Sequence, residues 1–203
     1  VAGVSQHVEA LRRLAEKHGY AHAFLQAEFM RGWVLTQDGQ VDAGVALMTR
    51  TVAARRASGA ELSLAVLLTI LAQTLLDCGR LDPALAASHE ALAQVAAHGE
   101  RIAAAAALTV HAKILIRSSN GSFLEFPLNG APDDLLLRAL DIARSQGCGL
   151  HAIRAAIVLC RLWGTQGSRH EARELLEAIL APYRHTLHKN DLGAALALLQ
   201  ELQ

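Results

Sequence analysis

The sequence predicts an all-α protein, a solenoid in which helix pairs of about 40 residues stack on one another. Three observations predict it. Glycines that suit helix ends recur at fixed intervals along the chain. The apolar residues between them are spaced three and four positions apart, which places them on one face of a helix. The composition is 52% hydrophobic and only 4% aromatic, a Leu/Ala-rich balance that stacked helices bury without bulky cores. No alternating strand pattern competes with this interpretation.

Two interleaved glycine series mark the predicted helix ends, because glycine enters the left-handed conformation at little steric cost. In the first series, Gly39 and Gly79 lie 40 positions apart and Gly167 is their later counterpart. The second series advances in steps of 40, 40 and 48 residues and consists of Gly19, Gly59, Gly99 and Gly147. The longer last step predicts an insertion in the third pair, at residues 118–132.

The stretch "LDCGRLDPAL" shows one predicted corner in detail. Gly79 suits the position just past a helix end. Asp82 is expected to cap the next helix and Pro83 to occupy its first helical position, where the missing N–H is harmless. The stretch is therefore expected to be a tight connection between two helices.

The elements follow in order along one domain, residues 1–203. An opening helix is expected around residues 8–18 and a closing helix at 190–203. The four pairs between them are expected at approximately residues 20–59, 60–99, 100–147 and 148–185.

Small residues in the first helix of each pair, followed three positions later by bulky ones, predict close helix packing. A small side chain beside a large one lets two helices approach and interlock. The small residues are Gly32, Ala72, Ala112 and Cys160, and the bulky ones are Leu35, Leu75, Leu115 and Trp163.

The insertion carries Phe123 and Phe126, two of the four phenylalanines. An exposed loop has little reason to carry them unless they pack on the solenoid or on a partner. We expect insertion contacts through both aromatic rings.

Charge and cysteine content exclude several function classes. The 19 basic and 19 acidic residues balance, so no overall field favours nucleic acid or an acidic membrane. The uncharged run at residues 62–76 falls short of the roughly 18 apolar residues that a membrane span needs. Three scattered cysteines do not predict a disulfide framework, which favours a reducing, cytoplasmic setting.

The sequence gives little support for a catalytic site or a metal site. The histidine and cysteine pairs lack the matching second pair that a zinc site needs, so surface or capping histidines, no metal and no cofactor are expected. Glu171 and Glu174 lie beside Arg173 and indicate a solvated face. Neither a phosphate-binding glycine loop nor a nucleophile elbow occurs, so we expect no catalytic residues and no enzyme. The closest pairs are His18 with His22, Cys148 with His151, and His185 with His188.

Residues 139–202 carry motifs that resemble a known family. The elements are "ARSQG" from Ala143, "RAA" from Arg154, "QG" at Gln166 followed by "EAR" and "LL", and "DL" at Asp191. They resemble the C-terminal tetratricopeptide (TPR)-like repeat region of bacterial signalling proteins. Those proteins join a class III adenylate or guanylate cyclase domain, or a transcription-regulator domain, to a STAND-type ATPase.

The resemblance implies a right-handed TPR-like superhelix that acts as a regulatory module and has no catalytic role. It is sharp in the last third of the chain and looser from about residue 20. It departs from the family after Tyr183, where an aromatic-rich stretch is usual. The chain opens at Val1, and we expect it to belong to a larger protein.

In TPR arrays the first helices line the concave side, which binds partners. The repeat register predicts a row of side chains on these helices that changes from apolar to basic along the array. The alternative to a binding role is that this row is simply the solvated side of each helix. The functional interpretation is a groove for an acidic peptide or carboxylate, since arginine binds carboxylates bidentately. The row comprises Trp33, Gln73, Lys113 and Arg161, with Arg117 and Arg154 close by.

Three function classes follow, in order of preference. The first is a protein-interaction module whose partner is a protein or peptide, an attached cyclase or ATPase domain, or a second copy of the chain. The second is a small-molecule sensor with an inducer pocket on the concave face. An enzyme comes third.

Overall fold

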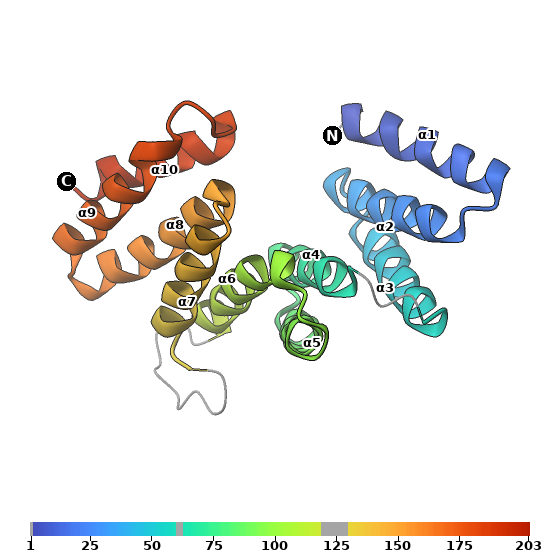
Figure 1. Cartoon of the computed structure of the whole chain (residues 1–203), viewed down its shortest axis with the longest axis horizontal. Coiled ribbons are helices and arrows are strands. Elements are labelled where there is room, and N and C mark those ends of the chain that lie inside the picture. The colour runs from blue at the N-terminus through green and yellow to red at the C-terminus, as the bar shows by residue number, and fades with distance from the viewer. Residues whose placement is uncertain (1, 60–62, 119–129) are drawn as a thin grey trace. The chain divides into compact units, whose positions relative to one another are not determined.

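A computed structural model describes residues 2–59, 63–118 and 130–203, and these residues are almost entirely helical. The predicted all-α architecture of helix pairs is confirmed, with no strand in the described ranges. Figure 1 shows the two helices of each pair lying side by side. The helices are α1 (Ala2–His18), α2 (Ala21–Gln37), α3 (Val41–Ala57), α4 (Leu64–Asp77), α5 (Leu81–His98), α6 (Arg101–Ser118), α7 (Pro132–Ser145), α8 (Gly149–Gln166), α9 (Arg169–Leu180), the 3-10 turn η1 (Ala181–Tyr183) and α10 (Lys189–Glu201).

The predicted pairs correspond to α2 with α3, α4 with α5, α6 with α7, and α8 with α9. The opening helix α1 begins at Ala2, earlier than the expected residue 8, and the closing helix is α10. The long glycine step lies in the α6–α7 connection, as expected. Phe123 and Phe126 lie outside the described residues, so their contacts stay a prediction.

Two compact units make up the chain, Val1–Glu100 and Arg101–Gln203. The first unit holds α1 to α5 and the second holds α6 to α10. Each pair lies within one unit, so each unit carries its own stacked helix pairs. Whether the units behave as the single expected domain stays a prediction.

Glycine corners end the helices as predicted. At Gly39 the backbone N–H donates to the carbonyl of Thr36, and the next N–H, of Gln40, donates to Leu35 at 2.9 Å. This double hydrogen bond satisfies carbonyls that the helix end leaves free, and it requires a left-handed residue. Positive φ angles between 63° and 98° occur at Gly19, Gly39, Gly59, Gly79, Gly99, Gly147 and Gly167.

The expected cap at Asp82 is wrong. Helix α5 begins at Leu81 with Arg80 as its N-cap, and no side chain caps it. Asp82 lies inside the first turn, where its carboxylate favours the positive end of the helix. Pro83 is tolerated there because the first-turn N–H groups have no partner within the helix.

In the first unit, α2 and α3 cross at two glycines. A Cβ on Gly44 would lie 2.5 Å from the carbonyl oxygen of Gly32, and one on Gly32 would lie 2.7 Å from Met48 Cγ. Gly32 is the first of the small residues that the sequence singled out. Its lack of a side chain lets the two backbones touch.

A buried cation also lies between α2 and α3, toward the start of α2 and the end of α3. Arg55 of α3 is fully buried, and its Nη1 donates to His22 Nε2 of α2 at 3.0 Å. A guanidinium only donates hydrogen bonds, so His22 Nε2 must be the unprotonated ring nitrogen. Burial lowers the pKa of Arg55, and the charge of Glu100 opposes that change.

In the second unit, α8 is the central helix and contacts α6, α7, α9 and α10. The Cys160 thiol donates to the carbonyl of Ala172 in α9, and Trp163 Nε1 donates to Asp133 Oδ2 in α7 at 3.0 Å. Cys160 and Trp163, predicted as the small and the bulky residue of this helix, therefore contact different neighbours of α8, namely α9 and α7. Tyr183 covers the start of α8, since a Cβ on Gly149 would lie 2.5 Å from its ring.

Candidate functional site: the α6–α8 face

The predicted binding row is divided between the two units. Trp33 of α2 and Gln73 of α4 belong to the first unit and are both partly exposed. Gln73 Nε2 donates to Asp77 Oδ1 on the same helix at 2.7 Å. The basic members of the row all lie in the second unit, so that unit is the one to consider for carboxylate binding.

On α6, four of the residues that reach solvent form a row along one side of the helix. Ile102 at its N-terminal end is 73% exposed, and Arg117 near its C-terminal end is also exposed. Ala106 and Lys113 lie between them and are partly exposed. Spacings of four and seven place these residues on one face.

The same positions recur 48 residues later on α8, which contacts α6. Leu150 is the counterpart of Ile102, and Arg161 is the counterpart of Lys113. Both α8 residues are exposed. We call this surface the α6–α8 face, and it comprises Ile102, Ala106, Lys113 and Arg117 of α6 with Leu150, Arg154, Arg161 and Thr165 of α8.

Every charged side chain on this face is positive. Helices α6 and α8 contain no Asp or Glu, although the whole chain has as many acids as bases. Three cations lie in the C-terminal halves of the two helices, and Arg117, in the last turn of α6, is also favoured by the helix dipole. The apolar Ile102 and Leu150 lie at the opposite ends. The face is therefore apolar at one end and cationic at the other.

Arg154 already holds a carboxylate. Its Nε donates to Asp191 Oδ1 at 2.8 Å and its Nη2 donates to Oδ2 at 3.2 Å. This bidentate pair joins α8 to the closing helix α10, and the Asp191 side chain is mostly buried. Arg154 thus holds α10 in place, whereas Arg117 and Arg161 enter no ion pair with any part of the chain that the structure describes.

His151 borders this ion pair on α8. Burial lowers the pKa of His151, and the nearby positive charge of Arg154 lowers it further. The imidazole consequently resists protonation in the folded chain.

Sequence reasoning missed Ile102, Leu150 and Asp191. The 48-residue step relates Ile102 to Leu150, so the register that identified Lys113 and Arg161 could have found both. Nothing in the local sequence marks Asp191 as the partner of Arg154, because their contact depends on how α10 packs. Lys113 is partly exposed on α6, and its part in binding stays a prediction.

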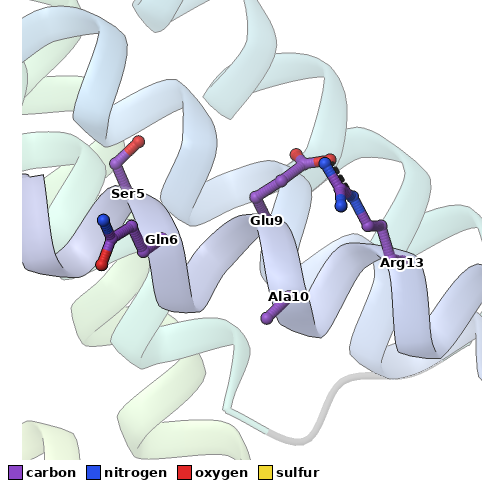
Figure 2. A pocket seen from close by; sticks show the side chains of 5 residues that line it. All are labelled: Ser5, Gln6, Glu9, Ala10 and Arg13. Carbon is purple, nitrogen blue, oxygen red and sulfur yellow. Dashed lines mark hydrogen bonds and ion pairs between the residues drawn. The ribbon is translucent and has the colours of Figure 1, made fainter.

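A shallow hollow of about 400 Å³ lies on α1 (Figure 2). Ser5, Gln6, Glu9, Ala10 and Arg13 line it. Hydrogen bonds from Arg12 and Arg13 lower the pKa of Glu9 to about 2, so this carboxylate has no proton to donate near neutral pH. The Glu9 carboxylate in this hollow is already paired with Arg12 and Arg13. All of the residues that line the hollow belong to α1.

Other candidate chemistry is sparse in the described ranges. Among residues 2–59, 63–118 and 130–203, no three His, Cys, Asp or Glu side chains gather as a metal site would need. No helix in these ranges has both the length and the apolar character to cross a bilayer. Burial raises the pKa of the Cys160 thiol to about 12, which keeps it protonated and unreactive.

Comparison with known proteins shows the fold. No protein-family model matches the chain, and no curated protein matches it. A crystal structure of nearly identical TPR-like repeats, assigned to a kinesin light chain of Podosopora anserina, matches with a TM-score of 0.65 and 20% identity. The match covers 88% of this chain and 84% of that one. A variant of those repeats with one substitution matches with a TM-score of 0.66. The chain is therefore similar in fold to TPR-like repeat proteins.

Proposed function

We propose that the chain is a protein-interaction module whose α6–α8 face binds an acidic segment of a partner protein. The observation that supports this most is the charge of the two helices, which carry exposed arginines and no acidic residue. Helix-pair repeats with TPR-like folds typically present such helices to partners. The Arg154–Asp191 contact illustrates, within the chain, the bidentate carboxylate binding that arginine favours.

The apolar and cationic ends of the α6–α8 face set the direction in which a partner segment would lie on it. Its carboxylates are expected beside Arg117 and Arg161, and an apolar side chain is expected beside Ile102 and Leu150. Exposed isoleucine and leucine at one end would add apolar burial to the charge contacts. Charge complementarity would mainly set specificity and association rate.

A peptide titration tests this function. A short labelled peptide with leucine at one end and glutamates at the other is titrated into the chain by fluorescence anisotropy, beside a peptide with glutamine at each glutamate. We expect the acidic peptide to bind more tightly and to weaken as salt increases. Equal binding of both peptides, or binding of neither, would count against the proposal.

A matched pair of variants tests the residues. Arg117→Gln with Arg161→Gln removes two positive charges from the face, and Arg138→Gln with Arg144→Gln removes two from exposed positions of α7. We expect the first variant to weaken acidic-peptide binding about tenfold or more, because hydrogen bonds to charged groups contribute about 1.5–3 kcal/mol each. The second variant should bind like the native chain.

We infer further that the module serves a larger bacterial signalling protein in the cytoplasm, with a cyclase domain or a STAND-type ATPase as its output. The supporting observation is the resemblance of residues 139–202 to the repeat regions of such proteins. The free cysteines Cys78, Cys148 and Cys160 agree with a reducing compartment. Reading the gene around this segment tests the inference, and an unrelated output domain would contradict it.

A further inference from the structure

Arg154 differs from the other cations of the α6–α8 face because it lies in the apolar half of that face. It follows Leu150 by one helical turn, and its counterpart on α6, 48 residues earlier, is Ala106. The same position is uncharged in α2 and α4 as well, where it holds Gln26 and Val66. An arginine without a counter-charge here would place a positive charge beside the apolar end of the face.

Asp191 of α10 supplies that counter-charge. Arg154 Nε and Nη2 donate to its two carboxylate oxygens at 2.8 Å and 3.2 Å. The Arg154 side chain is 53% exposed, whereas that of Asp191 is 15% exposed. The guanidinium therefore reaches solvent with its charge already matched by a largely covered carboxylate.

The packing of α10 on α8 keeps Asp191 in this position. Asp191 lies in the first turn of α10, where the helix dipole favours a carboxylate. At the other end of α10, Leu202 also contacts α8, since a Cβ on Gly164 would lie 3.0 Å from Leu202 Cδ2. A partner carboxylate that displaced Asp191 would leave a mostly buried charge without its ion pair, which is costly. The Arg154–Asp191 pair is therefore expected to persist when a partner binds.

We propose that Asp191 determines the specificity of the α6–α8 face, because it prevents Arg154 from binding a carboxylate of the partner. This inference rests on the function proposed above. A segment that is acidic along its whole length gains nothing at Arg154, and its extra carboxylate meets the negative charge of Asp191. The face therefore selects a segment whose carboxylates lie at one end, beside Arg117 and Arg161, and whose other end is apolar.

Two peptides compared on the native chain and on Asp191→Asn test the proposal. The first peptide has leucine at one end and glutamates at the other, and the second has one additional glutamate beside the leucine. Each is titrated by fluorescence anisotropy at pH 7.5. We expect the native chain to bind the second peptide no more tightly than the first. Asp191→Asn should bind the second about three- to fivefold more tightly than the first, because Arg154 is then free to pair with the additional glutamate.

Two control variants separate this effect from net charge and from packing. Glu177→Gln also removes one negative charge from an arginine pair, but that pair is exposed and lies within α9. Arg154→Gln with Asp191→Asn loses the same ion pair without leaving an unpaired guanidinium. Both controls should keep the ratio of affinities that the native chain shows for the two peptides. Circular dichroism verifies that each variant is folded.

The ratio of the two affinities decides the role of Asp191. Equal binding of both peptides by Asp191→Asn, or binding of neither, overturns the proposal. The same gain in the double variant also overturns it, since Arg154 is then absent, as does a native chain that prefers the second peptide. Failure of the native chain to bind the first peptide contradicts the function proposed above, whereas the ratio measured with Asp191→Asn concerns Asp191 alone.

Discussion

At the scale of single residues, Gly44 tests how closely α2 and α3 pack. A Cβ there would lie 2.5 Å from a backbone oxygen, which cannot move without shifting a helix. We expect Gly44→Ala to lower the free energy of unfolding by about 1–2 kcal/mol, because overpacking costs about 1–3 kcal/mol and exceeds the gain in helix propensity. Thermal unfolding measures the change.

Gly193→Ala is the control for that substitution. It makes the same chemical change within a helix, but a Cβ at Gly193 meets no atom within 4 Å. We expect it to raise the free energy of unfolding by about 0.5–1 kcal/mol through helix propensity alone. Equal effects of the two substitutions would mean that the helix crossing is looser than described.

His151 makes stability depend on pH. Its pKa is lowered in the folded chain, first by burial and then by Arg154, so the unfolded chain binds more protons below its ordinary pKa of 6.5. The stabilisation is present above pH 6.5 and is lost as pH falls toward the lowered folded pKa. We expect His151→Gln to flatten the decline in melting temperature between about pH 7 and pH 5. An unchanged slope would contradict this assignment.

At the scale of helices, the Arg154–Asp191 pair should hold α10 against α8. Arg154 is half exposed, so solvent screening limits the contribution to about 0.5–1 kcal/mol. We expect Asp191→Asn to speed hydrogen exchange of the α10 amides while α6 and α7 keep theirs. Glu177→Gln, which breaks an exposed ion pair within α9, should leave α10 unchanged. Equal protection of α10 in both variants would show that the pair is incidental.

The sequence predicted helix ends well and side-chain partners poorly. Positive φ at a helix end favours glycine, so the recurring Gly39 and Gly79 located the corners directly. The cap at Asp82 was wrong by two residues because helix starts depend on competing first-turn contacts. The burial of Arg55 and the pairing of Arg154 were not predicted, since both depend on residues brought close only by helix packing.

The same limit applies to the candidate site. The register placed Lys113, Arg117 and Arg161 in the row, and the structure finds them on the face formed by α6 and α8. Trp33 and Gln73 belong to the other unit, so a continuous row from them stays a prediction. Repeat spacing predicts which residues share a face, but it does not predict whether that face binds a partner.

At the scale of the whole molecule, a chain with no net charge contains two neighbouring helices, α6 and α8, that carry basic residues and no acidic one. Its net charge is zero, so binding of an acidic segment must arise from local charge. A folded chain that bound acidic peptides through its overall field would show no preferred surface.

Nuclear magnetic resonance mapping tests that claim most directly. The isotope-labelled chain is titrated with the leucine and glutamate peptide, and amide shifts are followed residue by residue. We predict that the largest changes fall along Ile102 to Arg117 of α6 and Leu150 to Thr165 of α8, and that they disappear with Arg117→Gln and Arg161→Gln. Shifts spread evenly over the chain, or gathered on α1 to α5, would contradict the account.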